Sequence, residues 1–243
     1  MINIKDEGRN LMHNGHRGRL KERFLKEGLD NFEQHNVLEL ALFYVIPRRD
    51  TNEIAHRLIE RFGSISRVMD ASVEDLVEVN GIGESVAVFL KFIPEFARRY
   101  IEDKGAFDNI INSTEKAGQF LLPKFIGRTD ENIIAVSLDS KCSVINSSIV
   151  SEGSVNEVSL NIRKLVEIAI KNKAISVILA HNHPNGLAIP SNEDIETTWK
   201  VKRALDYVGV NLLDHIIVAN NDFVSMRDSK KFQMIFEPDL YEE

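Results

Sequence analysis

The chain has 243 residues and a formal net charge of -7, which argues against a protein built mainly to coat nucleic acid but allows a local basic patch. Its length allows one large domain or two modest domains, each with a buried core, and we favour two. Cys142 is the single cysteine, which excludes an intramolecular disulfide and suits a reducing compartment. The N-terminus has no apolar stretch of signal length, and no run approaches a membrane span, so we expect a cytoplasmic protein without a membrane partner.

Basic residues and two histidines gather between residues 9 and 26. This segment could help the chain to dock on a phosphate backbone. Glu22 and Glu27 lie on the same segment, however, and favour a solvated helix face.

From residue 36 to about residue 99, apolar residues recur at helical spacing in short segments separated by turns. The predicted helices cover residues 37–46, 52–62, 64–69, 73–79 and 84–91. Short helices joined by tight turns are typical of an all-α module, which we assign to a first domain of residues 1–104.

Gly81 and Gly83, with one isoleucine between them, stand where the last two of these helices meet. A glycine, an apolar residue and a glycine between two helices resemble the helix-hairpin-helix motif. The glycines let the backbone approach a phosphate closely, and N–H groups at the start of the next helix point toward it. Residues 62–65 form a more degenerate second copy. DNA is therefore a candidate partner of this domain.

A second interpretation of the same loop is purely structural. Gly81 and Gly83 would then only turn the chain between packed helices. Glu78 and Glu84, which flank the loop, would repel a phosphate. The hairpin fold itself is predicted under both interpretations.

The helical pattern breaks at residues 103–108, the predicted boundary to a second domain of residues 105–243. A helix from Ser113 to Leu122, closed by Pro123, opens this domain. Strands are predicted at residues 133–138, 143–150, 175–180, 212–218 and 223–226, with a hairpin turn at 139–141. Further helices are predicted at residues 160–171 and 191–207. The second domain is therefore a mixed α/β unit around a sheet, and Cys142 is placed in a strand as a small core residue.

The stretch after residue 175 is the most informative in the chain. Five of the six residues from Ile175 to Ala180 are apolar and form a short buried strand, and the chain turns polar at His181. Because side chains alternate along a strand, His181 and His183 point the same way and Asn182 points the other. Pro184 then ends the strand, since it lacks the N–H that a ladder needs.

Ser191 opens the next helix, and Asp194 lies one helical turn into it. Asp194 can therefore be brought back over the end of the strand, where two imidazoles and one carboxylate converge. Three such ligands with a fourth position left to water are typical of a catalytic zinc site. The alternative is that Ser191 and Asp194 only cap the helix, a role that is compatible with metal binding.

The pattern His-x-His-Pro followed by Ser-x-x-Asp resembles the metal motif of the JAB/MPN+ (JAMM) metalloproteases. Residues 181–184, together with Asp214–Val218 further on, are similar to the RadC-type branch of that family. The resemblance covers essentially the whole chain and implies an α+β, mixed fold. In that fold an N-terminal all-α helix-hairpin-helix domain precedes a cytidine-deaminase-like α/β JAB/MPN domain. Two departures affect no ligand position: Asn185 replaces the usual serine, and residues 159–163 replace a Pro-Arg-Glu helix start.

The resemblance also implies roles for individual residues. His181, His183 and Asp194 would hold Zn²⁺, and Ser191 would donate a hydrogen bond to the oxyanion that develops when a carbonyl is attacked. An upstream glutamate would take a proton from the attacking water and give it to the leaving amine. The implied reaction is hydrolysis of an amide or isopeptide bond.

Two glutamates compete for the role of proton shuttle. Glu131 opens the strand at residues 133–138, which is where the family places its glutamate, whereas Glu152 lies where the following strand ends in a turn. Glu131 shares one strand face with Ile133, so it can reach the metal only if that face looks toward the end of the His181 strand. We favour Glu131.

Two functions of different classes follow. The favoured one is a zinc hydrolase that acts on a peptide or isopeptide substrate. The alternative is a DNA-associated protein of repair, recombination or processing, in which Gly81 and Gly83 contact the phosphate backbone and the metal domain supports them. Trp199 is interpreted as a packing residue, and His215 as a residue with a structural hydrogen bond, with a contact to the site as the alternative.

Overall fold

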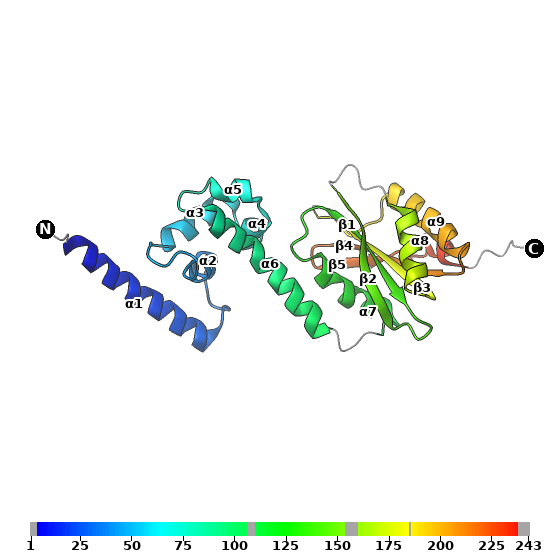
Figure 1. The fold of residues 1–243 in the computed structure, drawn as a ribbon, viewed down its shortest axis with the longest axis horizontal. Coiled ribbons are helices and arrows are strands. Elements are labelled where there is room, and N and C mark those ends of the chain that lie inside the picture. Colours follow the sequence, from blue (N-terminus) through cyan, green and yellow to red (C-terminus); the bar gives the residue numbers. More distant parts are fainter. Residues whose placement is uncertain (1–3, 106–109, 154–159, 185, 238–243) are drawn as a thin grey trace, which may run out of the picture. The chain divides into compact units, whose positions relative to one another are not determined.

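The computed structural model describes residues 4–105, 110–153, 160–184 and 186–237. Two compact units divide the chain, Met1–Phe96 and Ala97–Glu243 (Figure 1). The division falls inside the long helix α6, and residues 106–108 of the predicted boundary lie outside the described residues. The helices that begin in the first unit are α1 (Ile4–Glu27), α2 (Gln34–Leu42), α3 (Asn52–Phe62), α4 (Ile65–Asp70), α5 (Val73–Val77) and α6 (Glu84–Gly105).

Short helices and tight turns make up most of the first unit, as the apolar spacing predicts, and α3 confirms the helix predicted at residues 52–62. Helix α2 ends at Leu42 rather than at residue 46, because the N–H groups of Tyr44 and Val45 donate to carbonyl oxygens only three residues earlier, so turns replace the regular helical ladder. Helix α6 continues past its predicted end at residue 91. Pro94 removes one backbone donor but leaves the helical course intact.

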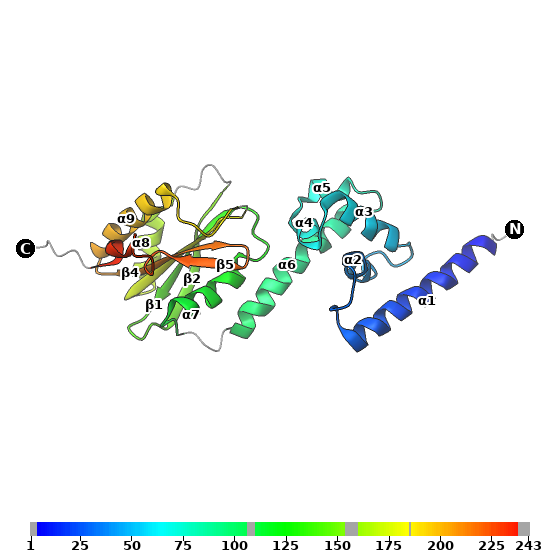
Figure 2. The same ribbon diagram turned by 180° about the vertical axis from the view of Figure 1, so that it is seen from behind.

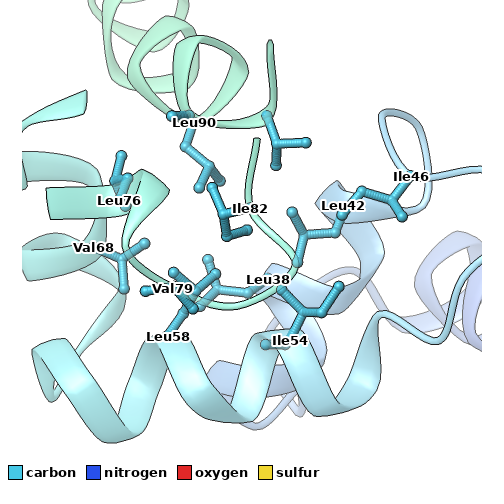
Figure 3. Close-up of a cluster of buried hydrophobic side chains, with 13 residues drawn as sticks. Leu38, Leu42, Ile46, Ile54, Leu58, Val68, Leu76, Val79, Ile82 and Leu90 are labelled. Carbon is cyan, nitrogen blue, oxygen red and sulfur yellow. The ribbon is translucent and has the colours of Figure 1, made fainter. Parts of the chain in front are cut away.

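The core of the first unit forms where these helices meet (Figure 3). Ile82, between the two hairpin glycines, points into this cluster and is buried. Gly81 has a positive φ of 102°, and a Cβ there would lie 2.8 Å from Ile54 Cδ1. Glycine at position 81 is therefore required both by the backbone and by the packing against α3.

Helix α1 is attached to this unit through its C-terminal half. The Arg17 guanidinium donates to the carbonyl oxygens of Ile46 at 2.6 Å and Arg49 at 2.7 Å, beyond the end of α2. His16 Nε2 lies 2.9 Å from a carboxylate oxygen of the buried Glu39. The expected solvated face of residues 9–26 therefore needs a correction at Arg17, because its guanidinium satisfies carbonyl groups where the helix ladder has ended.

The second unit is built around one sheet of five strands in the order β2-β1-β3-β4-β5 (Figures 1 and 2). Strands β3 and β4 are parallel, and the other neighbouring pairs are antiparallel. The elements of this unit after α6 are α7 (Thr114–Leu121), η1 (Leu122–Phe125), β1 (Glu131–Leu138), β2 (Val144–Gly153), α8 (Ile162–Lys171), β3 (Ser176–Asn182), α9 (Asn192–Asp206), β4 (Asn211–Ala219), β5 (Asp222–Ser225) and η2 (Gln233–Phe236).

Helices cover both faces of this sheet. Helices α8 and α9 pack on one face, against a cluster that includes Ile133 of β1 and Leu179 of β3. Helix α7 packs on the opposite face, where a Cβ at Gly118 would lie 2.2 Å from the ring of Phe223. Ser113 caps α7 as predicted, since its hydroxyl accepts the N–H of Lys116. Two covered faces explain why β1 and β3 are buried along nearly their whole length.

The turn between β1 and β2 corrects the prediction for Cys142. An oxygen of the Asp139 side chain accepts the N–H groups of Lys141 and Ser143, each at 2.8 Å, and so folds the predicted turn. Cys142 lies in this turn with φ of 60° and is only half-buried. It is therefore a turn residue, and neither its strand assignment nor its core assignment holds.

Candidate metal centre

The end of β3 presents two imidazoles on one face of the sheet. His181 is the penultimate residue of the strand and is buried, and His183 follows directly after the strand end. The backbone N–H of His183 donates to the carbonyl oxygen of Val218 on β4 at 2.7 Å, which keeps the chain extended past the strand end. The Nε2 atoms of His181 and His183 lie 2.9 Å apart. The two histidines therefore point the same way, as strand alternation predicts.

Asp194 reaches this strand end from the first turn of α9. The Ser191 hydroxyl accepts the N–H of Asp194 at 3.1 Å, and an oxygen of the Asp194 carboxylate accepts the N–H of Ser191 at 2.7 Å. This reciprocal capping box fixes the carboxylate at the helix start. Its other oxygen lies 3.0 Å from His181 Nε2. Asp194 therefore caps the helix and also approaches the histidines, two roles that the sequence analysis found compatible.

Three potential ligands thus meet at one point. His183 Nε2 lies 3.6 Å from an oxygen of Asp194, which completes the set of separations. Bonds of about 2.0 to 2.2 Å from zinc to nitrogen or oxygen place tetrahedral ligand atoms about 3.3 to 3.6 Å apart. The observed separations are close to these values, so the donor set fits a zinc ion. In the described part of the chain, this is the one group of three or more His, Cys, Asp or Glu ligands within 4.8 Å of one another.

Electrostatics favours an ionised carboxylate at this point. Burial opposes ionisation of Asp194, but hydrogen bonds with His181 and His183 outweigh it and hold the pKa of Asp194 well below its usual range. The hydrogen bond to Asp194 raises the pKa of His183 against the effect of burial, and the Leu187 carbonyl and the charge of Glu131 raise it further. The cluster therefore offers an anionic ligand at every pH above the acid range.

The orientation of His183 is fixed by the loop that follows it. Its Nδ1 atom lies 3.0 Å from the carbonyl oxygen of Leu187. Because a carbonyl only accepts, Nδ1 carries a hydrogen, and in the neutral imidazole Nε2 keeps its lone pair toward the cluster. Asn185, one of the two departures in the sequence pattern, lies outside the described residues. The other departure, at residues 159–163, is described only from Leu160, and Asn161 caps α8 there.

Glu131 meets the condition that strand parity imposes. Ile133 pairs with His181 in the β1–β3 ladder, so the side chains of these two residues share a face, and Glu131 two residues earlier shares it too. The charge of Glu131 is also near enough to raise the pKa of His183. Glu152 pairs with Asn132 in the β1–β2 register, a position of the opposite parity to Glu131.

Asn182 holds the backbone on both sides of Glu131. Its side-chain oxygen accepts the N–H of Asn132 at 2.7 Å, and its amide nitrogen donates to the carbonyl oxygen of Asp130 at 3.1 Å. Asn182 is buried, so these bonds are shielded from water. The middle residue of the His-x-His motif therefore ties the start of β1 to the end of β3.

The hairpin of the first unit is the second candidate site. The carbonyl oxygen of Gly83 accepts the N–H groups of Val86 and Ala87, which makes Gly83 the residue that precedes α6. Amides at such a helix start have no partner within the helix and face outward. A Cβ at Gly83 would meet nothing within 4 Å. Arg61 forms an ion pair with Glu78, so that one of the two acidic groups expected to repel a phosphate has a cationic partner.

Comparison with known proteins places these features in a family. A model of the RadC-like JAB domain matches residues 111–231, and a helix-hairpin-helix model matches residues 52–93. The UPF0758 proteins of Ruegeria pomeroyi and Fusobacterium nucleatum are each 34% identical to this chain, over 87% of it and over 95% and 94% of their own lengths. A UPF0758 protein of Carboxydothermus hydrogenoformans is 33% identical over 88% of this chain and 95% of its own length. This chain belongs to the RadC-like JAB family.

The two family matches confirm the predicted architecture, a helix-hairpin-helix module followed by an α+β RadC-like JAB domain. Glu131, Ser191 and the three clustered residues all fall within the RadC-like JAB match, and Gly81 and Gly83 fall within the helix-hairpin-helix match. Among the described residues of this RadC-like chain, no helix combines the length and apolar character needed to cross a membrane.

Sequence reasoning missed part of the surroundings of His181 in the RadC-like domain. His215 Nε2 lies 2.8 Å from His181 Nδ1, and the Thr198 hydroxyl lies 2.6 Å from His215 Nδ1. His215 therefore contacts the site, which was only the alternative interpretation. The sequence did contain a signal for Thr198: it lies four residues after Asp194 on α9, and residues at this spacing share one helix face. Trp199 packs against a buried cluster, as expected.

Two groups beside the RadC-like site have pKa values changed by burial. Burial lowers the pKa of His215 well below its usual value. Burial raises the pKa of Asp214 to about 6, although hydrogen bonds from Ser225 and from two backbone N–H groups oppose this effect. His215 is therefore neutral near pH 7.

Proposed function

We propose that the RadC-like JAB domain is a zinc-dependent hydrolase that cleaves an amide or isopeptide bond in a peptide or protein substrate. The observation that supports it is the convergence of His181 Nε2, His183 Nε2 and the Asp194 carboxylate at separations that suit a tetrahedral ion. Three nitrogen and oxygen ligands leave a fourth position for water or substrate, which distinguishes a catalytic zinc site from a structural one.

Two of the three ligand side chains come from a strand and a helix, and a loop carbonyl orients the third, so the site is held ready before the ion binds. His181 belongs to a buried strand, and Asp194 is held by the capping box of α9. When bound there, zinc would lower the pKa of a water molecule toward neutrality and polarise a carbonyl group.

Glu131 and Ser191 supply the remaining chemistry. We assign to Glu131 the role of general base, which takes a proton from the attacking water and returns it to the departing nitrogen. The Ser191 hydroxyl already accepts the N–H of Asp194, and this contact uses an oxygen lone pair and leaves the hydroxyl hydrogen available. That hydrogen can be donated to the oxyanion that forms when the carbonyl is attacked.

The test begins with metal content. Elemental analysis of the full chain should find about one zinc ion per chain, and the double variant His181→Ala/His183→Ala should lose it. A matched control is His35→Ala/His56→Ala, which removes two stacked imidazoles from the first unit and should leave zinc unchanged. Undiminished zinc in the His181/His183 variant would overturn the proposed site.

Activity is tested separately with a panel of peptide and isopeptide substrates. Cleavage should occur with the zinc-loaded chain and stop when a chelator removes the ion. Restoration on adding zinc back distinguishes loss of the ion from unfolding. If the chain binds zinc but cleaves no amide or isopeptide substrate, the proposed metal site stands and the proposed hydrolase activity is contradicted.

A second candidate function is DNA association through the hairpin of the first unit. The match to a helix-hairpin-helix model over residues 52–93 favours it, as do the open space at Gly83 and the outward amides of the following helix start. Binding of this type should be independent of DNA sequence and should weaken steeply with salt. Zinc-dependent hydrolysis without DNA binding at moderate salt would favour the hydrolase alone.

A further inference from the structure

A buried chain of three hydrogen bonds connects two of the clustered ligands. It begins at the backbone carbonyl of Asp194, which lies 2.5 Å from the Thr198 hydroxyl. The same hydroxyl lies 2.6 Å from His215 Nδ1, and His215 Nε2 lies 2.8 Å from His181 Nδ1. Thr198 is 0%, His215 2% and His181 5% exposed. Water therefore does not replace any of these partners, and each hydrogen on the chain must be accounted for.

The hydroxyl of Thr198 has a single hydrogen to place. The carbonyl oxygen of Asp194 can only accept, so that hydrogen lies on the bond between Thr198 and Asp194. The bond between Thr198 and His215 must then use a hydroxyl lone pair. Nδ1 of His215 therefore carries a hydrogen and donates it.

The position of this hydrogen fixes the next two nitrogen atoms. A neutral imidazole with a hydrogen on Nδ1 has a lone pair on Nε2, and a charged imidazolium is costly in the core. His215 Nε2 therefore accepts from His181 Nδ1. His181 then has a hydrogen on Nδ1, and in its neutral form the lone pair that a metal ligand needs is on Nε2, the atom that faces His183 and Asp194.

We propose that Thr198 and His215 are positioning residues that hold His181 in the tautomer and ring orientation required for a metal ligand. The relay, defined here as Asp194 carbonyl, Thr198, His215 and His181, ends on one ligand and begins on the backbone of another. It thereby couples the placement of α9 to that of β3. Its role in metal binding rests on the proposed zinc site, whereas the tautomers it sets exist in the chain without metal.

The contrast with His183 shows why a relay is required at His181. His183 Nδ1 donates directly to the Leu187 carbonyl in the loop. His181 Nδ1 faces β4 instead, where the neighbouring polar group is the side chain of His215. A side chain is a weaker determinant of tautomer than a carbonyl, because an imidazole nitrogen can either donate or accept. Thr198 removes this ambiguity by fixing His215 in turn.

Zinc affinity gives the first test. Competition with a chromophoric chelator should show 10- to 100-fold weaker binding in Thr198→Val, about the loss that follows removal of a partner behind a metal-ligating histidine. Thr198→Ser keeps the hydroxyl and should restore most of the affinity. Thr197→Val makes the same substitution one residue earlier on α9, outside the relay, and should leave affinity unchanged. Cobalt substitution should shift the visible spectrum in Thr198→Val alone, which a merely destabilised fold would not produce.

Nitrogen-15 NMR of the imidazoles gives a second test that needs no variant of the relay to fold. In the full wild-type chain near pH 8, the signals of His181 and His215 should both show the hydrogen on Nδ1. The other five histidines can be assigned from single His→Gln variants, which leaves the two relay signals by elimination. A hydrogen on Nε2 of His215, or none on Nδ1 of either residue, would overturn the relay.

The outcomes separate the relay from the function on which it rests. Zinc binding with equal affinity in wild type and Thr198→Val contradicts the relay and leaves the proposed hydrolase standing. Expected tautomers in a wild-type chain that binds no zinc support the relay as a fixed arrangement and contradict the proposed function.

Discussion

Ile133 on β1 lies opposite His181 on β3 in the antiparallel ladder. Because alternate residues of a strand share a face, this pairing puts Glu131 on the face that carries the two histidines. A general base that is not a ligand moves protons and leaves coordination alone. Glu131→Gln should therefore keep its zinc and lose hydrolysis by roughly two to four powers of ten, measured as turnover beside elemental analysis.

Glu152→Gln is the matched control for this prediction, since it makes the same change at the competing glutamate. Glu152 pairs with Asn132 in the β1–β2 register, so its strand position has the opposite parity to that of Glu131. We expect unchanged zinc and unchanged turnover. If Glu152→Gln is inactive and Glu131→Gln remains active, the general base is Glu152 and our assignment is wrong.

Asn182 braces the backbone that carries Glu131, and its removal should act through that residue. Asn182→Ala leaves the N–H of Asn132 and the carbonyl of Asp130 without their partner, at a cost of about 1 to 3 kcal/mol for each group. Turnover should fall while zinc content stays the same. In the Glu131→Gln background, the same change should lower turnover little further. Fully additive losses in this double-mutant cycle would mean that Asn182 acts independently of Glu131.

The sequence pattern accounts for those parts of the fold and site that depend on local spacing. Strand alternation brings His181 and His183 to one face, and the Ser-x-x-Asp pattern gives the capping box that holds Asp194. The contact between His181 and His215 spans 34 residues and depends on how β3 and β4 pair in parallel. No local period specifies that register, so the relay behind His181 could not be read from the pattern.

Two of the predicted element boundaries are wrong, and in both cases the reason is a local interaction that residue spacing does not reveal. Cys142 comes shortly before the apolar, β-forming residues Val144 and Ile145, yet the Asp139 side chain binds two backbone N–H groups and extends the turn through it. Helix α6 continues through Pro94 to Gly105, because a proline costs one hydrogen bond and does not by itself end a helix already formed.

The two hairpin glycines should respond differently to substitution. A Cβ at Gly83 would meet no atom within 4 Å, and φ there is not in the left-handed region, so Gly83→Val should fold and yet block the close approach of a phosphate. DNA binding, measured by fluorescence anisotropy over a salt series, should weaken in this variant. Unchanged binding in a folded Gly83→Val chain would return the loop to its purely structural interpretation.

Gly81→Ala serves as the contrasting variant. It introduces a Cβ 2.8 Å from Ile54 Cδ1 at a residue with φ of 102°. Loss of stability by about 1 to 3 kcal/mol is therefore expected from backbone strain and crowding together. Thermal unfolding of both variants separates a folding defect from a binding defect, and equal stability of Gly81→Ala and wild type would contradict this packing.

Asp214 should make stability depend on pH in a direction opposite to that of most carboxylates. Burial raises its pKa from 3.8 to about 6 in the folded chain. The folded state therefore binds more protons than the unfolded state between these values, so this group lowers stability above pH 6 and the cost disappears as pH falls toward 4. The shift corresponds to on the order of 3 kcal/mol. Other groups titrate in the same range, which is why the measurement must be a difference between two chains.

Asp214→Asn removes the titration and provides that difference. An asparagine can still accept the N–H groups of His215 and Arg227 and can donate to Ser225, so the local fold should persist. Urea unfolding at pH 7 and pH 4 gives the free energy of unfolding of each chain. Only wild type gains stability when Asp214 is protonated. The free energy of unfolding of wild type minus that of the variant should therefore increase by on the order of 3 kcal/mol from pH 7 to pH 4. A constant difference across this range would mean that Asp214 titrates alike in the folded and unfolded chains, and that burial beside the RadC-like site does not hinder its ionisation.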